Sequence, residues 1–570
     1  MRQGGGPGGR YRGRVGERDV AYCAGEREPS QSSQSTKRSR PLEPRSVTLV
    51  SLVILAAAIG FSQPPPARAA ETGGAFVMTV NADTIALERF TRSGDQVTGA
   101  LAFRLTGLRF DYALTLAPGG GVRHMENAVR PASATLAAPP TQSATLDWSA
   151  DSVIAEVHPG GVQRLGTRAG SVPYLNPSIL LLELIVQRAL SATPPLDSVP
   201  VFAVAGGRTL LMAVRRVRAD SVVVGLGGAE FQLRLGADRE IVSGGVPAQG
   251  VSFRRIEVLP ERLLAMAPPD YSPPAGAPYT AERVRVPTRG GFELVGTLTR
   301  PRKPGRVPCV VTITGSGQQE RDEALLIVRG YRPFRQIADT LARRGIAVLR
   351  LDDRGTGESG GVVAGSTSVD FADDVEDALR WLRHAGGIDS TRLALLGHSE
   401  GGLIAPLVAA RGVPLRGMVL LAGPAWTGRR IMEYQNTQLA KKKYSGASLD
   451  SVMRLATHAV DSLAAAEPWV GYFARHDPLE VARTLKSPPV LVLQGATDRQ
   501  VAAEQAPELA GAFKRAGNPD VTLRVLPATN HLFLPDPSGD PAGYSALRVS
   551  EIPRATLGII ADWLAARLRP

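Results

Sequence analysis

The sequence predicts a β-rich, mostly antiparallel domain followed by an α/β domain with a mostly parallel sheet. Between about Gly73 and Pro260, apolar residues alternate with a period of two and Gly-containing turns separate the runs. After a Pro-rich break, apolar strands alternate with helical patterns, as in βαβ units. Of the 570 residues, 43% are hydrophobic and 21% charged, which excludes wholesale disorder, collagen and a polytopic membrane protein.

An export signal is expected before the first domain. Residues 47–61 form an uncharged apolar run, which follows the basic segment 37–40 and precedes a stretch of small residues ending at Ala69 and Ala70. The run is shorter than the roughly 20 residues that span a bilayer, so cleavage after Ala69 is favoured over an uncleaved anchor. We therefore expect residues 1–70 to be a basic, disordered leader with a signal peptide at about 37–69. The mature protein is expected to be exported, periplasmic or extracellular, in a bacterium.

The net charge of +13 raises the question of a nucleic acid or an anionic membrane as a partner. Residues 1–70 hold eleven basic and five acidic residues, a net charge of +6. The remaining +7 is spread thinly over the other 500 residues. We expect no nucleic-acid partner and no stable membrane span after signal cleavage. The two cysteines, Cys23 and Cys309, are too few for a Cys-rich zinc or iron–sulfur site, and no metal or organic cofactor is expected.

The domain boundaries follow from these composition changes. We expect a β-rich domain of unknown role over 71–266, in which Ile179 to Leu190 resembles a helix. A Pro-rich linker is expected over 267–279, because proline at that density resists both helix and sheet. The α/β domain is expected over 280–570.

Within the α/β domain, apolar runs predict strands at 309–314, 347–351, 393–397, 417–421, 490–494 and 522–526. Helices are expected near 333–344, 370–385, 401–411, 503–516 and 554–568. A helical, polar insertion at about 425–487 interrupts this rhythm and is expected to be a lid over the C-terminal sheet edge, where ligands bind in open α/β sheets. Its aromatic side chains are expected either to form an acyl pocket or to pack the lid: Trp426, Tyr434, Tyr444, Trp469, Tyr472 and Phe473.

The strongest motif is Gly-His-Ser-Glu-Gly-Gly at 397–402, between a predicted strand and a predicted helix. A serine nucleophile projects from a sharp strand-to-helix turn, and small residues such as Gly397 and Gly401 remove the Cβ atoms that would clash there. A serine hydroxyl also needs a base that is oriented by a carboxylate. Asp498 and His531 each follow a predicted strand, in the chain order Ser, Asp, His. The sequence therefore predicts the catalytic triad Ser399, Asp498 and His531.

Acyl transfer also needs two backbone N–H donors for the tetrahedral oxyanion. One is expected from Glu400, the residue after the nucleophile, whose carboxylate is a further candidate for shaping the site. The other is expected from the turn after the first core strand, with Ser316 favoured and Gly317 as the near alternative.

These motifs resemble a known family. Residues about 280–570 resemble an α/β-hydrolase of the exported bacterial esterase type, near the serine aminopeptidase-like and dienelactone-hydrolase-like groups. The matching segments are 315–322, 353–359, the 397–402 turn, Asp477-Pro478 and 498–501. Relatives often have His where Thr314 stands, so only a backbone role carries over there. The resemblance implies an α/β-hydrolase fold and hydrolysis of a small-molecule carboxylic ester by a serine esterase.

Two alternative functions remain open. The same machinery would suit a serine peptidase or aminopeptidase that acts on short peptides. The β-rich domain could instead be the main functional unit, binding lipid, glycan or an envelope polymer, with hydrolysis secondary. The oligomeric state, acyl length and alcohol moiety are not predicted.

Overall fold

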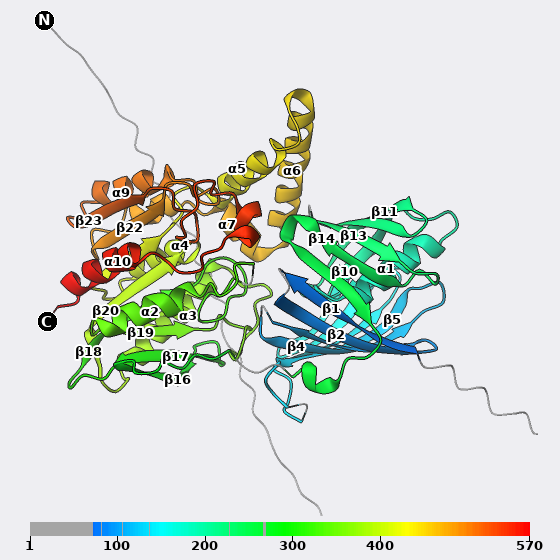
Figure 1. The fold of residues 1–570 in the computed structure, drawn as a ribbon, viewed down its shortest axis with the longest axis horizontal. Helices are drawn as coiled ribbons and strands as arrows, with labels where there is room; N and C mark the ends of the chain where they lie inside the picture. Colours follow the sequence, from blue (N-terminus) through cyan, green and yellow to red (C-terminus); the bar gives the residue numbers. More distant parts are fainter. Residues whose placement is uncertain are drawn as a thin grey trace, which may run out of the picture. The chain divides into compact units, whose positions relative to one another are not determined.

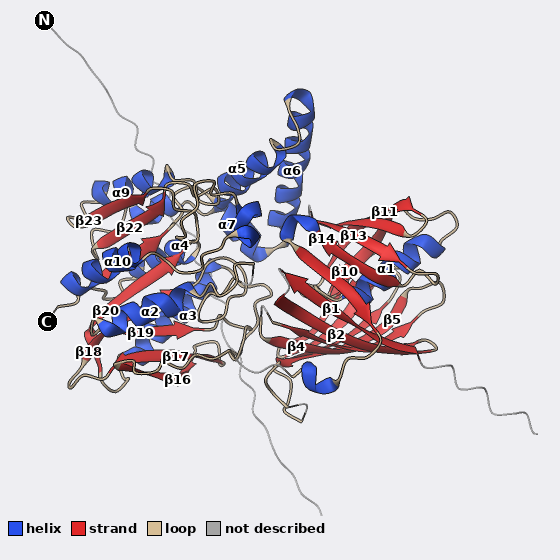
Figure 2. Ribbon diagram, viewed as in Figure 1, coloured by secondary structure: helices blue, strands red, loops and turns tan. Residues whose placement is uncertain are grey.

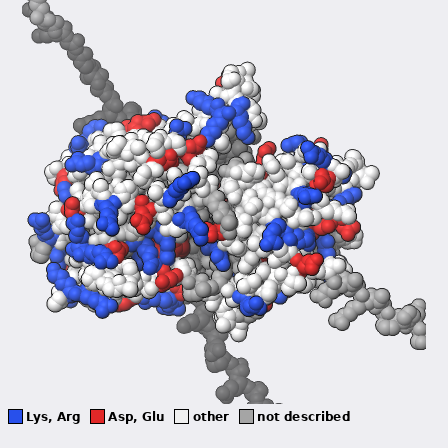
Figure 3. All heavy atoms as spheres, in the orientation of Figure 1, with Lys and Arg blue, Asp and Glu red and all other residues white. Residues whose placement is uncertain are grey.

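The computed structural model describes residues 72–569, except 81–82, 105, 136, 227–228, 266–268 and 326. The predicted leader and signal peptide, with Cys23, lie outside the described residues, as does part of the predicted linker. No helix in the described ranges is long and apolar enough to cross a membrane. Figure 3 shows Lys and Arg interspersed with Asp and Glu on the visible face.

The N-terminal part forms one sheet of fifteen strands, in the order β8-β7-β6-β5-β4-β3-β2-β1-β15-β14-β13-β12-β11-β10-β9 (Figure 1). All neighbours pair antiparallel except β9 and β10, so the mostly antiparallel prediction is confirmed. The strands are β1 (Thr72–Val80), β2 (Asp83–Ser93), β3 (Gln96–Phe103), β4 (Leu108–Leu116), β5 (Val122–Pro131), β6 (Gln142–Trp148), β7 (Ser152–His158), β8 (Gly161–Gly166), β9 (Val172–Tyr174), β10 (Ser198–Ala203), β11 (Arg208–Arg218), β12 (Ser221–Leu226), β13 (Ala229–Leu235), β14 (Ile241–Val246) and β15 (Val251–Ile256).

Helix α1 (Ile179–Ser191) confirms the one helix predicted in this part. Its side chains pack with the inward-facing apolar residues of the sheet in a single buried cluster. The buried carboxylate of Glu88 on β2 accepts hydrogen bonds from the amides of Ile179 and Leu180 and from the hydroxyls of Ser178 and Tyr112. Burial raises the pKa of Glu88. These bonds satisfy amides that the first turn of a helix leaves unpaired, and they fix α1 to the sheet.

The C-terminal part holds a second sheet of eight strands in the order β16-β17-β19-β18-β20-β21-β22-β23. Strand β17 pairs antiparallel with both neighbours, and the other pairs are parallel. The strands are β16 (Tyr279–Pro287), β17 (Glu293–Pro301), β18 (Val307–Ile313), β19 (Ala347–Leu351), β20 (Ile388–His398), β21 (Gly417–Leu421), β22 (Val490–Gly495) and β23 (Val521–Leu526). Strand β18 is buried along its whole length, as expected for a parallel strand covered on both faces.

Helices cover both faces of this sheet (Figure 2). One face packs against α2 (Pro333–Arg343) and α10 (Arg554–Arg567). The other packs against α3 (Ser368–Leu382), α4 (Gly401–Ala410) and α9 (Gln505–Arg515). Cys309 lies on the central strand β18 and is fully buried, which raises the pKa of its thiol to about 12.

Between β21 and β22 the chain forms four helices, α5 (Gly428–Ala440), α6 (Gly446–Ala466), α7 (Pro468–Arg475) and α8 (Pro478–Ala482). This helical insertion falls in the region expected to be helical, and its role as a lid stays a prediction. Three short 3₁₀ segments complete the elements: Pro247–Gln249, Glu261–Leu263 and Pro541–Ala546.

Candidate active site

Ser399 lies at the turn between β20 and α4 and has a φ of 53°, in the left-handed region. Its amide donates to the carbonyl of Leu421 over 2.8 Å, which anchors the turn to the next strand. A Cβ on Gly397 would lie 2.0 Å from the Gly401 carbonyl oxygen, and one on Gly401 would lie 2.2 Å from that of Ile313. Glycine is therefore required at both positions. The turn has the form of the nucleophile elbow that the motif predicts.

Asp498 and His531 are brought together by the loops that follow β22 and β23. His531 Nδ1 lies 2.8 Å from Asp498 Oδ2, and both side chains are buried. The other carboxylate oxygen accepts from the amides of Gln500 and Val501, and Gln494 Nε2 donates to Oδ2. Because an ionised carboxylate only accepts, His531 carries its proton on Nδ1 and leaves Nε2 free to accept one.

Ser399 follows β20 at the same edge of the sheet, where the C-terminal ends of the parallel strands meet. Within the described part of the chain, no hydrogen bond from Ser399 Oγ is recorded. A hydrogen bond between a serine hydroxyl and its histidine base often forms only when substrate is bound.

The turn after β18 lies directly against Ser399. A Cβ placed on Gly315 would be 3.3 Å from the Cβ of Ser399. The amide of Gly315 already donates to Glu323 Oε1 over 2.7 Å. The structure records no acceptor among the described residues for the amides of Ser316, Gly317 or Glu400. These amides are therefore free to donate, and the choice between Ser316 and Gly317 as the second oxyanion donor stays a prediction.

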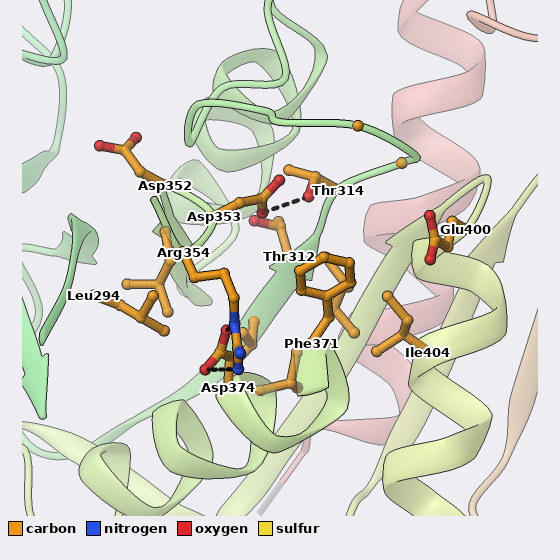
Figure 4. Close-up of a pocket in the computed structure, with 16 residues that line it drawn as sticks. Leu294, Thr312, Thr314, Asp352, Asp353, Arg354, Phe371, Asp374, Glu400 and Ile404 are labelled. Carbon is orange, nitrogen blue, oxygen red and sulfur yellow. Dashed lines mark hydrogen bonds and ion pairs between the residues drawn. The ribbon is translucent and has the colours of Figure 1, made fainter. Parts of the chain in front are cut away.

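Asp353 holds this turn in place. Its carboxylate accepts from Thr314 Oγ1 over 2.7 Å and from the amide of Gln319 over 2.9 Å. Burial raises its pKa well above the usual range. The neighbouring Arg354 pairs instead with Asp374 on α3, whose pKa burial raises to about 6 (Figure 4).

A cavity of about 50 Å³ lies beside the turn, between the sheet and helices α3 and α4. Apolar side chains form much of its wall, including Leu294, Phe371 and Ile404, and the Glu400 carboxylate faces them (Figure 4). The cavity is lined on its other side by Gly315 and Gly317 of the turn after β18.

The Glu400 side chain connects the elbow to the helical insertion. It is 3% exposed and accepts from Ser368 Oγ on α3 over 2.6 Å and from Trp469 Nε1 on α7 over 2.8 Å. Burial raises its pKa, because its partners are neutral donors that only partly replace water. The sequence named Trp469 only as one of six aromatics, since a contact between residues 69 positions apart leaves no local pattern.

Replacing Trp469 by phenylalanine is expected to lower the free energy of unfolding by about 2 kcal/mol, because a buried carboxylate loses a donor. The ring of Phe473, which stacks on Trp469 with centroids 5.3 Å apart, can still pack against the new side chain. Urea unfolding measures the change. Tyr472→Phe is the matched control, since it removes a hydrogen bond to His476 on the same helix and leaves Glu400 untouched. Equal losses in the two variants would contradict a particular role of the Trp469 contact.

Part of the C-terminal sequence is similar to known proteins. Residues 327–538 match the family model described as serine aminopeptidase, S33. Esterase EstD of Thermotoga maritima is 26% identical over 278 residues, which is 48% of this chain and 65% of that protein. The chain thus spans about two thirds of the length of this curated relative.

Two solved structures are similar over about half of the chain. An esterase from Pyrococcus furiosus shares 18% identity with a TM-score of 0.38, covering 53% of this chain and 98% of that one. Est1E from Butyrivibrio proteoclasticus, solved with ferulic acid, shares 16% identity with a TM-score of 0.33, covering 50% and 99%.

The strand order and the elbow give the C-terminal part of the chain the α/β-hydrolase fold, and the family match lies within this part.

Proposed function

We propose that the protein is a serine hydrolase that cleaves carboxylic esters through an acyl-enzyme. The observation that carries the proposal is the placement of Ser399 on a left-handed elbow at the sheet edge that also holds the Asp498–His531 pair. The similarity to a curated esterase supports an ester substrate.

In the proposed mechanism, Ser399 Oγ attacks the ester carbonyl carbon while its proton passes to His531 Nε2. The carbonyl oxygen becomes an oxyanion that accepts from the amides of Glu400 and Ser316. The C–O bond to the alcohol then breaks, and His531 returns its proton to the leaving oxygen. Water attacks the acyl-enzyme by the same route, releasing the carboxylic acid and restoring Ser399. Asp498 keeps the His531 tautomer fixed and stabilises its positive charge in both transition states.

The cavity beside the oxyanion turn is proposed to hold the acyl group. One water-sized site needs about 10–15 Å³ of such volume, so a cavity of about 50 Å³ takes only a few heavy atoms. The acyl chain is therefore proposed to be short.

Residues 70–570 are expected to hydrolyse p-nitrophenyl acetate and butyrate with a kcat/KM about tenfold or more above that for the octanoate, because the longer chain does not fit. The measurement is initial rates across the three esters, with fluorophosphonate labelling as a test of the serine. A folded protein that showed no turnover and no labelling would contradict the proposed function. A preference for octanoate would contradict only the assignment of the cavity.

A second candidate is a serine aminopeptidase, which the description of the matching family favours. Aminoacyl p-nitroanilides distinguish the two, because amide turnover with little ester preference would support the peptidase. We also propose that the protein is exported, from the signal-like segment at 37–69; detection of a mature chain starting at Ala70 outside the cytoplasm tests this.

A further inference from the structure

His398, the residue before the nucleophile, is buried between two hydrogen-bond acceptors. Its Nδ1 lies 2.9 Å from Glu323 Oε1, and its Nε2 lies 3.0 Å from the backbone carbonyl oxygen of His531. The side chain is 7% exposed, which leaves little room for water to act as a partner. The carbonyl oxygen can only accept, and Glu323 Oε1 already accepts from the amide of Gly315, so both ring nitrogens are placed to donate. A histidine with two donating nitrogens is an imidazolium.

Glu323 is held in an unusual backbone conformation that aims its carboxylate at His398. Its φ is 55°, in the left-handed region, and its side chain is almost fully buried. Besides His398, Oε1 accepts from the amide of Gly315 over 2.7 Å, on the turn proposed to bind the oxyanion. One carboxylate oxygen therefore joins the oxyanion turn to the nucleophile elbow.

The same histidine reaches the base of the triad. The rings of His398 and His531 are 4.8 Å apart between centroids and tilted by 43°. The other titratable groups around the pair are Asp498, which bonds to His531 Nδ1, Asp353 beside Glu323, Tyr544 at the His531 backbone, and Tyr331, whose hydroxyl donates to the carbonyl of Leu532 over 2.8 Å. The ring of Phe533 packs edge-on against the ring of His398, with centroids 6.1 Å apart.

We propose that Glu323 and His398 form a buried carboxylate–imidazolium pair that positions the oxyanion turn, the elbow and the His531 loop together and favours the neutral, proton-accepting form of His531. This inference rests on the proposed function. Both residues act through others and are positioning residues.

The effect of the His398 charge on His531 has a definite direction. Burial by itself lowers the pKa of His398, but the charge of Glu323 and the hydrogen bonds to Glu323 and the His531 carbonyl outweigh burial, so the pKa is raised. The resulting positive charge, one ring away, opposes a second positive charge on His531. Loss of the imidazolium removes that opposition and leaves the Glu323 carboxylate behind.

The first test is the pH dependence of kcat/KM for p-nitrophenyl butyrate. His398→Asn can keep the donor toward Glu323, and His398→Gln can keep the donor toward the His531 carbonyl, but both lose the charge. Each is expected to move the midpoint of the acidic limb upward by about one pH unit. We also expect kcat to fall about tenfold with little change in KM, because positioning and not substrate contact is disturbed.

Two further proteins separate charge from structure. In Glu323→Gln/His398→Gln both charges are absent, so the acidic limb is expected to return toward that of the wild type while kcat stays low. This double variant has no unpaired buried charge, so it is the one expected to fold if a single variant does not. His458→Gln, on the exposed side of α6, is the matched control and is expected to leave the profile unchanged.

A second readout does not depend on activity. In the Ser399→Ala protein with nitrogen-15-labelled histidine, the His398 signals, assigned by their loss in Ser399→Ala/His398→Gln, are expected to report two protonated nitrogens at pH 7. A neutral His398 at pH 7 would overturn the proposal, as would an unchanged acidic limb in both single variants of an active enzyme. A wild-type protein without turnover or fluorophosphonate labelling would instead overturn the proposed function, with the NMR result still deciding the state of His398.

Discussion

The Ser399→Ala variant is expected to lose about a million-fold in kcat for ester hydrolysis and all labelling by a fluorophosphonate probe. The hydroxyl oxygen is the atom that forms the covalent bond to the acyl group, and no other group takes over that role. The fold is expected to survive, because the elbow is held by the amide of Ser399 and by the glycines around it, and not by the hydroxyl. Active-site titration and steady-state rates against p-nitrophenyl butyrate measure the loss.

Ser448→Ala is the matched control for this variant. It removes an exposed hydroxyl on α6, whose hydrogen bond goes to the carbonyl of Ser445, and is expected to keep full activity and labelling. Residual activity of Ser399→Ala within tenfold of the wild type would assign the nucleophile elsewhere.

The Asp498→Asn variant is expected to lower kcat about ten-thousandfold. The amides of Gln500 and Val501 would still bond to the carbonyl oxygen at this position, so the amino group would face His531 Nδ1. An amino group donates, and it would therefore drive the His531 proton from Nδ1 to Nε2, where it blocks acceptance of the serine proton. Stabilisation of the protonated histidine would be lost as well.

The measurement is kcat over a range of pH. A wrong His531 tautomer lowers kcat at every pH, whereas a shifted titration would let kcat recover at a different pH. The control is Asp540→Asn, which changes a surface carboxylate paired with Lys442 and is expected to leave kcat unchanged. Full activity of Asp498→Asn at any pH would show that the His531 tautomer is set by other contacts.

Sequence reasoning located the elements that build the site because their signals are local. The strand ahead of Ser399, the small residues around it and the turns after β22 and β23 each follow from a short pattern, and the parallel sheet brings their ends together. The helices were found within a few residues of their observed bounds; α3, for example, runs from Ser368 to Leu382 against an expected 370–385.

The rest of the site depends on contacts between distant residues. Glu323 and His398 are 75 positions apart, and neither lies in a pattern that predicts an ion pair. The sequence shows His398 only as part of the 397–402 motif, and its two polar partners appear only once the loops after β18 and β23 are folded together. The strands β16 and β17 were also not predicted, because a strand that pairs antiparallel at the edge of a parallel sheet has no βαβ rhythm around it.

The position of Cys309 gives the α/β domain its own reporter of opening. It is the one cysteine among the described residues, it lies at the centre of the sheet, and it is inaccessible to solvent. A protein that starts at residue 70 lacks Cys23, so Cys309 is the thiol that a reagent would modify. The reagent can reach Cys309 only after the sheet separates from its covering helices. The rate of modification in the native state would thus measure the free energy of that opening directly, without denaturant and without substrate.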